Sequence, residues 1–125
     1  MTALEHVRVL CLALPETSER PSHGSPPFFI RAKKSFVTFV DNHHGDGRLA
    51  IWCAAPEGMQ IALVGDGSGR YFVPPYVGHL GWVGMRLEGE PDWDEVAGVI
   101  EDAWGTVAPK RLVEGTRGRQ ADARG

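Results

Sequence analysis

The sequence predicts an α+β fold in two layers, a two-layer α/β arrangement in which an antiparallel sheet of about five strands carries helices on one face. Two observations predict this class. Segments with helical periodicity and capping residues stand near both ends of the chain, and strand-like runs follow one another across brief turns between them. Strands in hairpin succession exclude alternating βαβ units, so we expect the order α-β-β-β-α-β-β-α.

The first helix is predicted over residues 2–14. Thr2 is a suitable N-cap, and Glu5 stands three residues later, as in a capping box. Apolar residues then recur at helical spacing, and Pro15 ends the segment. Residues 15–27 are punctuated by proline and glycine and are therefore predicted to form a polar loop.

Three strands in an antiparallel meander are expected next, because runs rich in aromatic and β-branched residues are joined by short links. The middle strand is apolar on both faces and is therefore expected inside the sheet. Lys33 and Lys34 form the predicted tight turn before it, and residues 42–47 form the predicted hairpin loop after it. The three strands are expected at residues 28–32, 35–41 and 48–54.

A short helix over residues 57–64 is predicted after Pro56, because proline suits the start of a helix. Two more strands are expected at residues 70–73 and 82–88, separated by a corner that contains proline and glycine. In the second of these strands every other residue is apolar, so one of its faces is expected to meet the helices. That face consists of Val83, Met85 and Leu87.

The last helix is expected to begin after Asp92, which is a suitable N-cap. Gly105 is predicted to interrupt this helix, and residues 107–112 are predicted to add a final helical turn. A chain of 125 residues can bury one core, so residues 1–114 are predicted to form a single domain. The polar, glycine-rich residues 115–125 are predicted to form a flexible tail.

The composition is close to that of ordinary soluble proteins, with 42% hydrophobic and 23% charged residues. No apolar run approaches the roughly 20 residues needed to span a membrane, and the first residues do not resemble a signal peptide. We therefore expect no membrane partner and a cytoplasmic location. Cys11 and Cys53 are expected to be buried as small hydrophobic residues.

The sequence contains no recognisable catalytic motif, and no cofactor is expected. A Gly-x-Ser-x-Gly motif is absent, and neither cysteine has a positional partner. His43, His44 and Asp46 form the most metal-like cluster, but no third His or Cys stands at ligand spacing, so we expect a solvated hairpin tip. Residues 65–69 precede a strand rather than a helix, which favours a turn over a phosphate loop. A catalytic site assembled from residues that are far apart in the chain remains an alternative.

The charge of the chain is uneven. The formal net charge of −3 and the pI of about 5.9 count against a generic nucleic-acid-binding protein. Seven acids lie between Glu88 and Asp102 with no Lys or Arg among them, which leaves room for a basic patch elsewhere. Basic residues at the hairpins can contact phosphates, or they can solubilise a turn and guard a sheet edge. The candidate phosphate contacts are Arg31, Lys33, Lys34, Arg48, Arg70 and Lys110.

The corner before the last strand is a second candidate site, either an interface or a small-molecule pocket. It contains aromatic side chains with polar tips, which are frequent binding anchors. The alternative is that Trp82 only closes the end of the core. The candidate residues are Tyr76, His79, Trp82 and Arg86.

Several motifs together resemble the MmcQ/YjbR family over nearly the whole chain, from about Leu14 to Leu112. Their order and spacing carry the resemblance more than any single motif does. The motifs are Leu14-Pro15-Glu16 after the first helix, Lys34-Ser35-Phe36 at a hairpin, Pro74, Tyr76-Val77 and Gly81-Trp82-Val83 around the corner, and Val107-Ala108-Pro109-Lys110 near the end.

The resemblance implies an antiparallel fold of the expected element order, related to CyaY-like and secretion-chaperone-like shapes. It also implies DNA binding through a double-wing motif. Two positions depart from the family's pattern. Lys33 stands where the hairpin usually has glycine, so either the turn differs or Lys33 adopts a strained conformation. Ala103-Trp104 replaces a Ser-Tyr pair, a change that a packing role would tolerate and that a functional role would not.

The leading hypothesis is a small non-enzymatic binding protein that contacts DNA through its basic hairpins. The first alternative is a protein-interaction or adaptor module that uses the corner around Trp82 and the acidic last helix. The second alternative is a small-molecule-binding protein with a pocket at the same corner.

Overall fold

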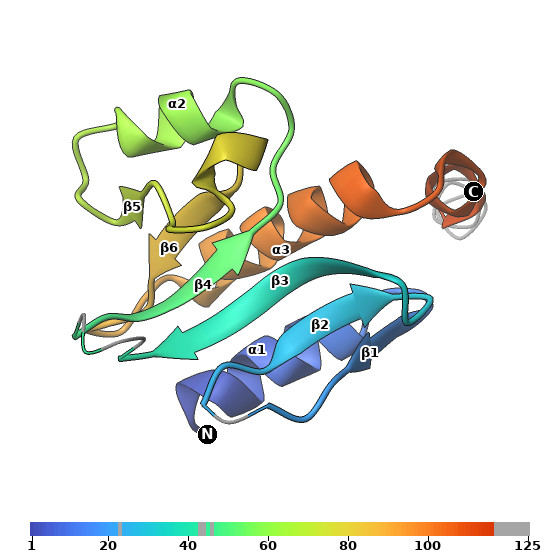
Figure 1. Cartoon of the computed structure of the whole chain (residues 1–125), viewed down its shortest axis with the longest axis horizontal. Helices are drawn as coiled ribbons and strands as arrows, with labels where there is room; N and C mark the ends of the chain where they lie inside the picture. The colour runs from blue at the N-terminus through green and yellow to red at the C-terminus, as the bar shows by residue number, and fades with distance from the viewer. Residues whose placement is uncertain (23, 43–44, 46, 117–125) are drawn as a thin grey trace.

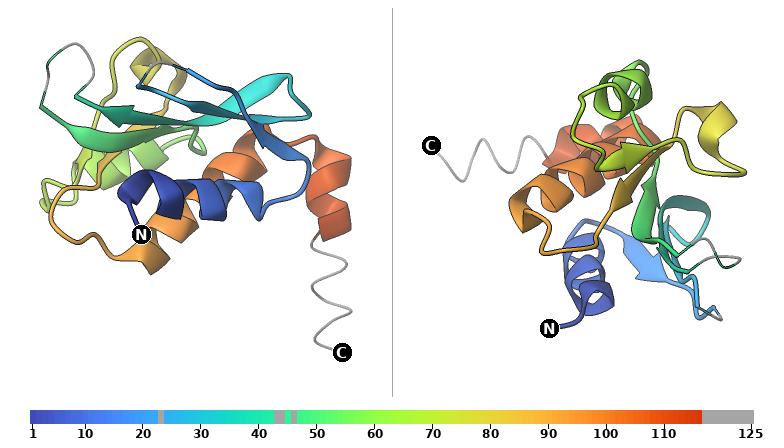
Figure 2. Two further views of the ribbon diagram at one scale, coloured as in Figure 1. Left: turned by 90° about the horizontal axis from the view of Figure 1, so that it is seen from below. Right: turned by 90° about the vertical axis from the view of Figure 1, so that its left-hand side faces the viewer.

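The computed structural model describes residues 1–22, 24–42, 45 and 47–116. A six-stranded antiparallel sheet in the order β1-β2-β3-β4-β6-β5 carries the α-helices on one face, and a short 3-10 helix lies on the other side (Figures 1 and 2). This confirms the predicted α+β, two-layer class. The elements in chain order are α1 (Ala3–Leu12), β1 (Thr17–Glu19), β2 (Pro27–Ile30), β3 (Lys34–Asp41), β4 (Leu49–Cys53), α2 (Met59–Val64), β5 (Tyr71–Phe72), the 3-10 helix η2 (Gly78–Leu80), β6 (Val83–Arg86) and α3 (Trp93–Val107).

The strand β1 lies inside the segment that the sequence predicts as a polar loop. Its backbone pairs antiparallel with β2, with Thr17 opposite Ile30 and Glu19 opposite Phe28. The Glu19 carboxylate also accepts hydrogen bonds from Arg8 on α1, at 2.6 and 3.0 Å. The three residues of β1 are polar and do not alternate with apolar ones. This strand forms because its backbone pairs with β2 and its Glu19 side chain binds Arg8 of α1.

The two long helices begin at their predicted caps. The Thr2 hydroxyl accepts the Glu5 N–H at 3.1 Å, at the start of α1. The Asp92 carboxylate accepts backbone N–H groups of Asp94 and Glu95 at the start of α3. These side chains satisfy backbone donors that have no partner inside a helix.

The prediction that Gly105 interrupts the last helix is wrong. The helix α3 continues through it to Val107, and the chain is helical again over residues 110–116. Glycine in a helix costs only about 1 kcal/mol relative to alanine. The neighbouring Ala103 and Trp104 are buried against the core, and this packing outweighs the local preference of one glycine.

The main core lies between the sheet and the helices. Val83, Met85 and Leu87 are buried in it, as predicted, and so are Cys11 and Cys53. Burial raises the pKa of both thiols because the thiolate form is poorly solvated there. The hydroxyl of Tyr71 on β5 donates to the carboxylate of Glu95 on α3, so the edge of the sheet is tied to the helix layer.

The opposite face of the sheet has a smaller apolar cluster of Val40, Ala50, Trp52 and Phe72. This confirms that the middle strand of the predicted meander, β3, is apolar on both faces and lies inside the sheet, between β2 and β4. Gly84 makes room for the Phe72 ring, since a Cβ at position 84 would lie 2.4 Å from a ring carbon.

No helix in the described part of the chain combines the length and the apolar character needed to cross a membrane. The predicted flexible tail begins at residue 115, and residues 115 and 116 continue the helical stretch that starts at residue 110. The remainder of that tail, residues 117–125, lies outside the described residues.

Candidate functional site

The β2–β3 hairpin turns over Arg31 and Ala32, two residues earlier than the predicted turn at Lys33 and Lys34. The Lys33 N–H closes the turn onto the Ile30 carbonyl at 3.0 Å. Arg31 and Ala32 have φ values of 52° and 54°, and positive φ at both central positions matches the right-handed twist of the strands. Lys33 is not in this conformation. Of the two expectations for Lys33, the structure therefore has the one in which the turn differs from the family's pattern and Lys33 is not strained. Lys33 and Lys34 follow it with exposed side chains.

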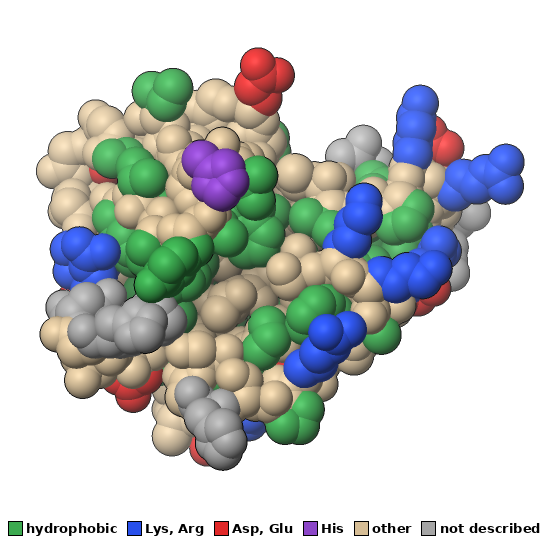
Figure 3. All heavy atoms as spheres, in the orientation of Figure 1, with side chains coloured by type: hydrophobic (Ala, Val, Ile, Leu, Met, Phe, Trp, Pro, Cys, Tyr) green, Lys and Arg blue, Asp and Glu red, His purple; other side chains and the backbone are tan. Residues whose placement is uncertain are grey.

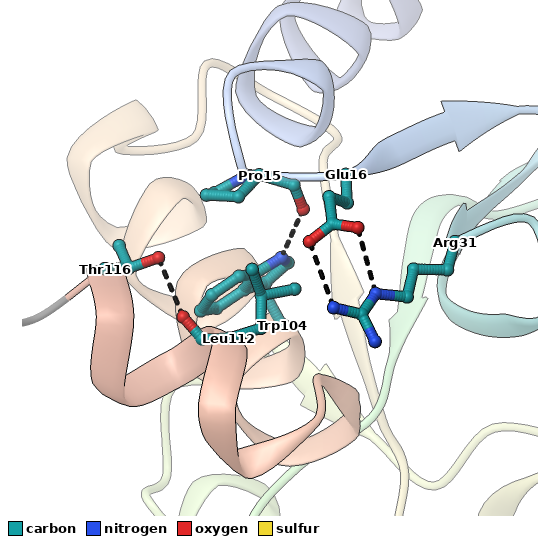
Figure 4. Close-up of polar contacts among 6 residues, drawn as sticks. All are labelled: Pro15, Glu16, Arg31, Trp104, Leu112 and Thr116. Atoms are coloured by element: carbon teal, nitrogen blue, oxygen red, sulfur yellow. Dashed lines mark hydrogen bonds and ion pairs between the residues drawn. The ribbon is translucent and has the colours of Figure 1, made fainter.

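Arg31 is held in place by Glu16. The Glu16 carboxylate accepts hydrogen bonds from Arg31 Nε at 2.9 Å and Nη2 at 3.3 Å (Figure 4). The Arg31 backbone N–H donates to the Glu16 carbonyl at 2.8 Å. The third nitrogen of the guanidinium group, Nη1, points away from Glu16 and has no partner among the described residues.

Arg20 also reaches this hairpin. Its guanidinium lies 3.8 Å from the centroid of the Phe29 ring, and it donates to the Ala32 carbonyl at 2.7 Å. A cation over an aromatic face is attracted by the ring quadrupole. Arg20 therefore adds a positive charge beside the turn, where two contacts hold it.

The helical stretch 110–116 lies at the same end of the molecule as this hairpin (Figures 1 and 2). Residues from both line one hollow, including Arg31 from the hairpin and Arg111 from the helical stretch. Figure 3 shows Lys and Arg side chains gathered at this end. We call this surface the cationic end, and it consists of Arg20, Arg31, Lys33, Lys34, Lys110 and Arg111.

Most cations of the described part of the chain already have partners. Three arginines make ion pairs, to Glu16, Glu19 and Glu88. The others with partners contact backbone carbonyls or aromatic rings. Four lysine and arginine side chains have no ion pair, hydrogen bond or ring contact among the described residues, and all four lie at the cationic end. They are Lys33, Lys34, Lys110 and Arg111.

Arg48 and Arg70 lie away from the cationic end. The strand β3 belongs to both hairpins of the meander, so their tips stand at opposite ends of that strand, roughly 25 Å apart. Arg48 follows the second tip, with its guanidinium 4.2 Å from the centroid of the Phe72 ring. Arg70 donates to the carbonyls of Arg86 and Glu88 at 3.0 Å each. Of the six predicted phosphate contacts, the structure brings four together.

The predicted corner is partly packed and partly exposed. Trp82 is half-buried and packs against both apolar clusters, so it closes the end of the core. Tyr76 is 67% exposed, has a φ of 65°, and its ring centroid lies 6.3 Å from that of Trp52. His79 is exposed as well.

Hydrogen bonds fasten this corner to its neighbours. The Gln60 side chain on α2 donates to the carbonyls of Gly78 and Trp82, at 2.8 and 2.7 Å. Arg86 lies 3.7 Å from the Glu88 carboxylate and 5.6 Å from the centroid of the Phe72 ring. Arg86 therefore has partners on the sheet, the Glu88 carboxylate and the Phe72 ring.

The comparison with known families gives one match. A model of the YjbR family matches residues 12–106, about three quarters of the chain. The chain belongs to the YjbR family. None of the curated proteins compared with it matches. The YjbR match covers every strand of the sheet and stops before Lys110 and Arg111, so these two cations lie outside the matched region.

The Leu-Pro-Glu motif of this YjbR chain joins three elements (Figure 4). The Pro15 carbonyl accepts a hydrogen bond from the Trp104 indole at 3.1 Å, and Glu16 binds Arg31. Trp104 is 5% exposed and Ala103 is fully buried. At the two positions that depart from the family's Ser-Tyr pair, this chain therefore has packing residues.

In the described part of the chain, no group of three or more His, Cys, Asp or Glu side chains is placed to hold a metal ion. His43, His44 and Asp46 lie outside the described residues. Within the glycine-rich segment 65–69, the Asp66 carboxylate accepts the Ser68 N–H at 2.8 Å. Hydrogen bonds from Ser68 lower the pKa of Asp66, as is usual for a carboxylate in a turn.

Sequence reasoning missed two members of the cationic end. Arg111 follows directly after Lys110, and that pair of adjacent cations was the available signal. Arg20 gives no such signal, because its position depends on the pairing of β1 with β2. That pairing, extended by the Arg20 N–H donating to the Pro27 carbonyl at 3.0 Å, brings Arg20 beside Phe29.

Proposed function

We propose that this YjbR protein binds DNA by contacting the phosphate backbone with its cationic end. The observation that carries the proposal is that Lys33, Lys34, Lys110 and Arg111 gather there without partners in the described part of the chain. Lysine and arginine side chains that neutralise phosphates release counterions, and this release supplies much of the affinity for nucleic acid. Unpartnered cations can do so without breaking an existing ion pair.

The net charge of the chain limits how such binding works. The chain carries a net charge of −3, and acids on α3 such as Glu101 and Asp102 are exposed. These acids repel a polyanion, so the contact is confined to the cationic end and is weak at physiological salt. If four cations each neutralise one phosphate, the logarithm of the binding constant falls with the logarithm of salt concentration with a slope of about −3.6.

The proposed role is that of a binding protein rather than an enzyme, and its proposed location is the cytoplasm. The sequence carries no catalytic motif. The side chains that gather at the cationic end are lysines and arginines, which are residue types that hold phosphates.

Titration of labelled duplex DNA at several salt concentrations tests the proposal. Lys33→Gln with Lys34→Gln is expected to weaken binding at low salt and to reduce the salt slope by about 1.8, because two phosphate contacts are lost. Arg48→Gln with Arg86→Gln removes the same charge at the Phe72 ring. This control pair is expected to leave the slope unchanged.

Two results would overturn the proposal. One is the absence of duplex binding by the full chain at low salt. The other is an equal loss of affinity in the lysine pair and in the arginine control pair, since that would show a general effect of net charge rather than contacts at the cationic end. Circular dichroism of each variant verifies that it is folded.

A second candidate function, a protein-interaction module, is favoured by apolar side chains exposed at the corner. Val73, Tyr76 and Leu80 are 55%, 67% and 62% exposed. Exposed apolar groups mark contact sites when they gather in one place. The predicted contribution of the acidic last helix does not fit the same interface, because η2 and α3 lie on opposite sides of the sheet (Figure 2).

The expected partner of the corner is a protein that presents apolar side chains. A partner retained by the unmodified chain and by Lys33→Gln with Lys34→Gln, but lost with Leu80→Asp, would support this function. Retention by Leu80→Asp as well would contradict it, because a carboxylate cannot be buried in an apolar contact without a large penalty.

A further inference from the structure

A hollow of about 300 Å³ lies between the β2–β3 hairpin and the end of α3. We call it the hairpin hollow. Its apolar members are Ile30, which is 3% exposed, the half-buried Val107, and the exposed Pro109. Its cationic members are Arg31, Lys33 and Lys34.

This hollow therefore combines an apolar floor with a cationic rim. Arg31 also lines the neighbouring hollow of about 330 Å³, together with Arg111 and Leu112. Arg31 thus lines both hollows, and the Nη1 of its guanidinium is not used by Glu16. A ligand that fits this surface needs an apolar body of small size and an anionic group beside it.

Duplex DNA supplies only half of that chemistry. Its phosphates can reach the lysines, but its bases are stacked and paired inside the helix, so the apolar floor would stay unfilled. An unpaired nucleotide supplies both parts, because its base has an apolar π-face and its phosphate is adjacent. Unstacked bases also stack on arginine guanidinium planes, and Glu16 fixes the plane of Arg31 through two hydrogen bonds (Figure 4).

We infer that the hairpin hollow binds an unpaired nucleotide of a single-stranded nucleic acid, with the base against Val107 and Pro109 and the phosphate at Lys33 and Lys34. The inference rests on the proposed binding of nucleic acid through the cationic end. It adds that unpaired bases contribute to the affinity, so a single strand binds more tightly than the same strand without its bases.

The test compares three labelled probes of equal length with the full chain: a thymidine 12-mer, the same strand with abasic residues, and a duplex. The abasic strand keeps the phosphates and lacks the bases. We expect the thymidine strand to bind about fivefold more tightly than the abasic strand. This is the lower end of what stacking of one base on an aromatic side chain contributes, because the floor of the hairpin hollow is aliphatic. Thymidine monophosphate is added as a competitor. It tests whether a free nucleotide can occupy the same site as a nucleotide within a strand.

Substitutions that leave the net charge unchanged test whether the tighter binding of the thymidine strand arises at the hairpin hollow. Val107→Thr with Pro109→Ser makes the floor polar without changing the charge. It is expected to remove the advantage of the thymidine strand and to leave the affinity for the abasic strand unchanged. Val73→Thr makes the same kind of change at the exposed corner and serves as the control.

Equal affinity of the unmodified protein for the thymidine and abasic strands overturns the inference, and this comparison needs no variant to fold. If duplex binding in the same experiment still depends on Lys33 and Lys34, the proposed function stands while the inference falls. If none of the three probes binds at low salt, the proposed function falls with it. Displacement of the thymidine strand by the mononucleotide, but not by inorganic phosphate, supports the nucleotide site.

Discussion

Glu16 and Arg31 are joined at three points although they are 15 residues apart in the chain. The carboxylate accepts two hydrogen bonds from the guanidinium, and the Glu16 carbonyl accepts the Arg31 backbone N–H at 2.8 Å. Both residues have positive φ, 59° for Glu16 and 52° for Arg31. This conformation costs an L residue roughly 1 to 2 kcal/mol, and the shared contacts offset that strain.

The first prediction concerns this pair. Glu16→Gln and Arg31→Gln are each expected to lower the urea midpoint of unfolding, and the double variant is expected to lower it by less than the sum of the two. The coupling is small, because both side chains are 46% exposed and water screens the pair. Strict additivity would show that the contact contributes nothing to stability.

Ala32 offers a test of the hairpin turn. Its φ of 54° lies in the left-handed region, which asparagine adopts more readily than alanine. We expect Ala32→Asn to raise the free energy of unfolding by about 0.5 to 1 kcal/mol. Ala32→Val is expected to lower it, since β-branched residues are disfavoured at this φ. Urea denaturation measures both, and a gain in stability from valine would contradict the turn.

Gly84 tests the packing of the second apolar cluster. A Cβ there would lie 2.4 Å from the Phe72 ring, so Gly84→Ala is expected to lower the free energy of unfolding by about 1 to 3 kcal/mol. Gly98 in α3 is the matched control, because a Cβ there meets nothing within 4 Å. Gly98→Ala is expected to raise stability by about 0.5 to 1 kcal/mol. Thermal unfolding of both variants measures these changes. A change in stability of the same sign in both variants would contradict this packing.

The Arg8–Glu19 pair predicts a dependence of stability on pH. Hydrogen bonding to Arg8 lowers the pKa of the Glu19 carboxyl in the folded state. A carboxyl with a lower pKa in the folded chain stabilises the fold above its unfolded pKa, near 4.3, and this stabilisation is lost as the pH falls through the folded value. The loss of stability caused by Arg8→Gln is therefore expected to be largest near pH 6 and to shrink below about pH 4.

Urea denaturation of the unmodified chain and of Arg8→Gln across this pH range provides the measurement. Lys110→Gln is the control, because it removes one positive charge from a side chain without an ion pair in the described part of the chain. An Arg8→Gln effect of equal size at pH 3 and pH 6 would show that Arg8 acts through packing rather than through its charge.

The strands of the core were predictable because their signal is local. Residues 35–41 are apolar on both faces and residues 82–88 alternate, and the faces that these patterns indicate are buried in the fold. The strand β1 was not predictable in the same way, because Thr17–Glu19 are polar and become a strand only beside β2. The prediction that Gly105 interrupts the last helix is wrong for a related reason, since the burial of Trp104 decides the length of α3.

The candidate site likewise combines features that have a local sequence signal with features that depend on tertiary contacts. The sequence by itself determined the fold class, the helix caps and the family motifs, because periodicity and capping act over a few residues. Only the tertiary structure decided which cations share a surface. The strand β3 carries its two hairpins at opposite ends and separates Arg48 from Lys33. The chain after α3 brings Arg111 to the first hairpin, where it lines a hollow together with Arg31. Such distances depend on topology, which residue spacing does not encode.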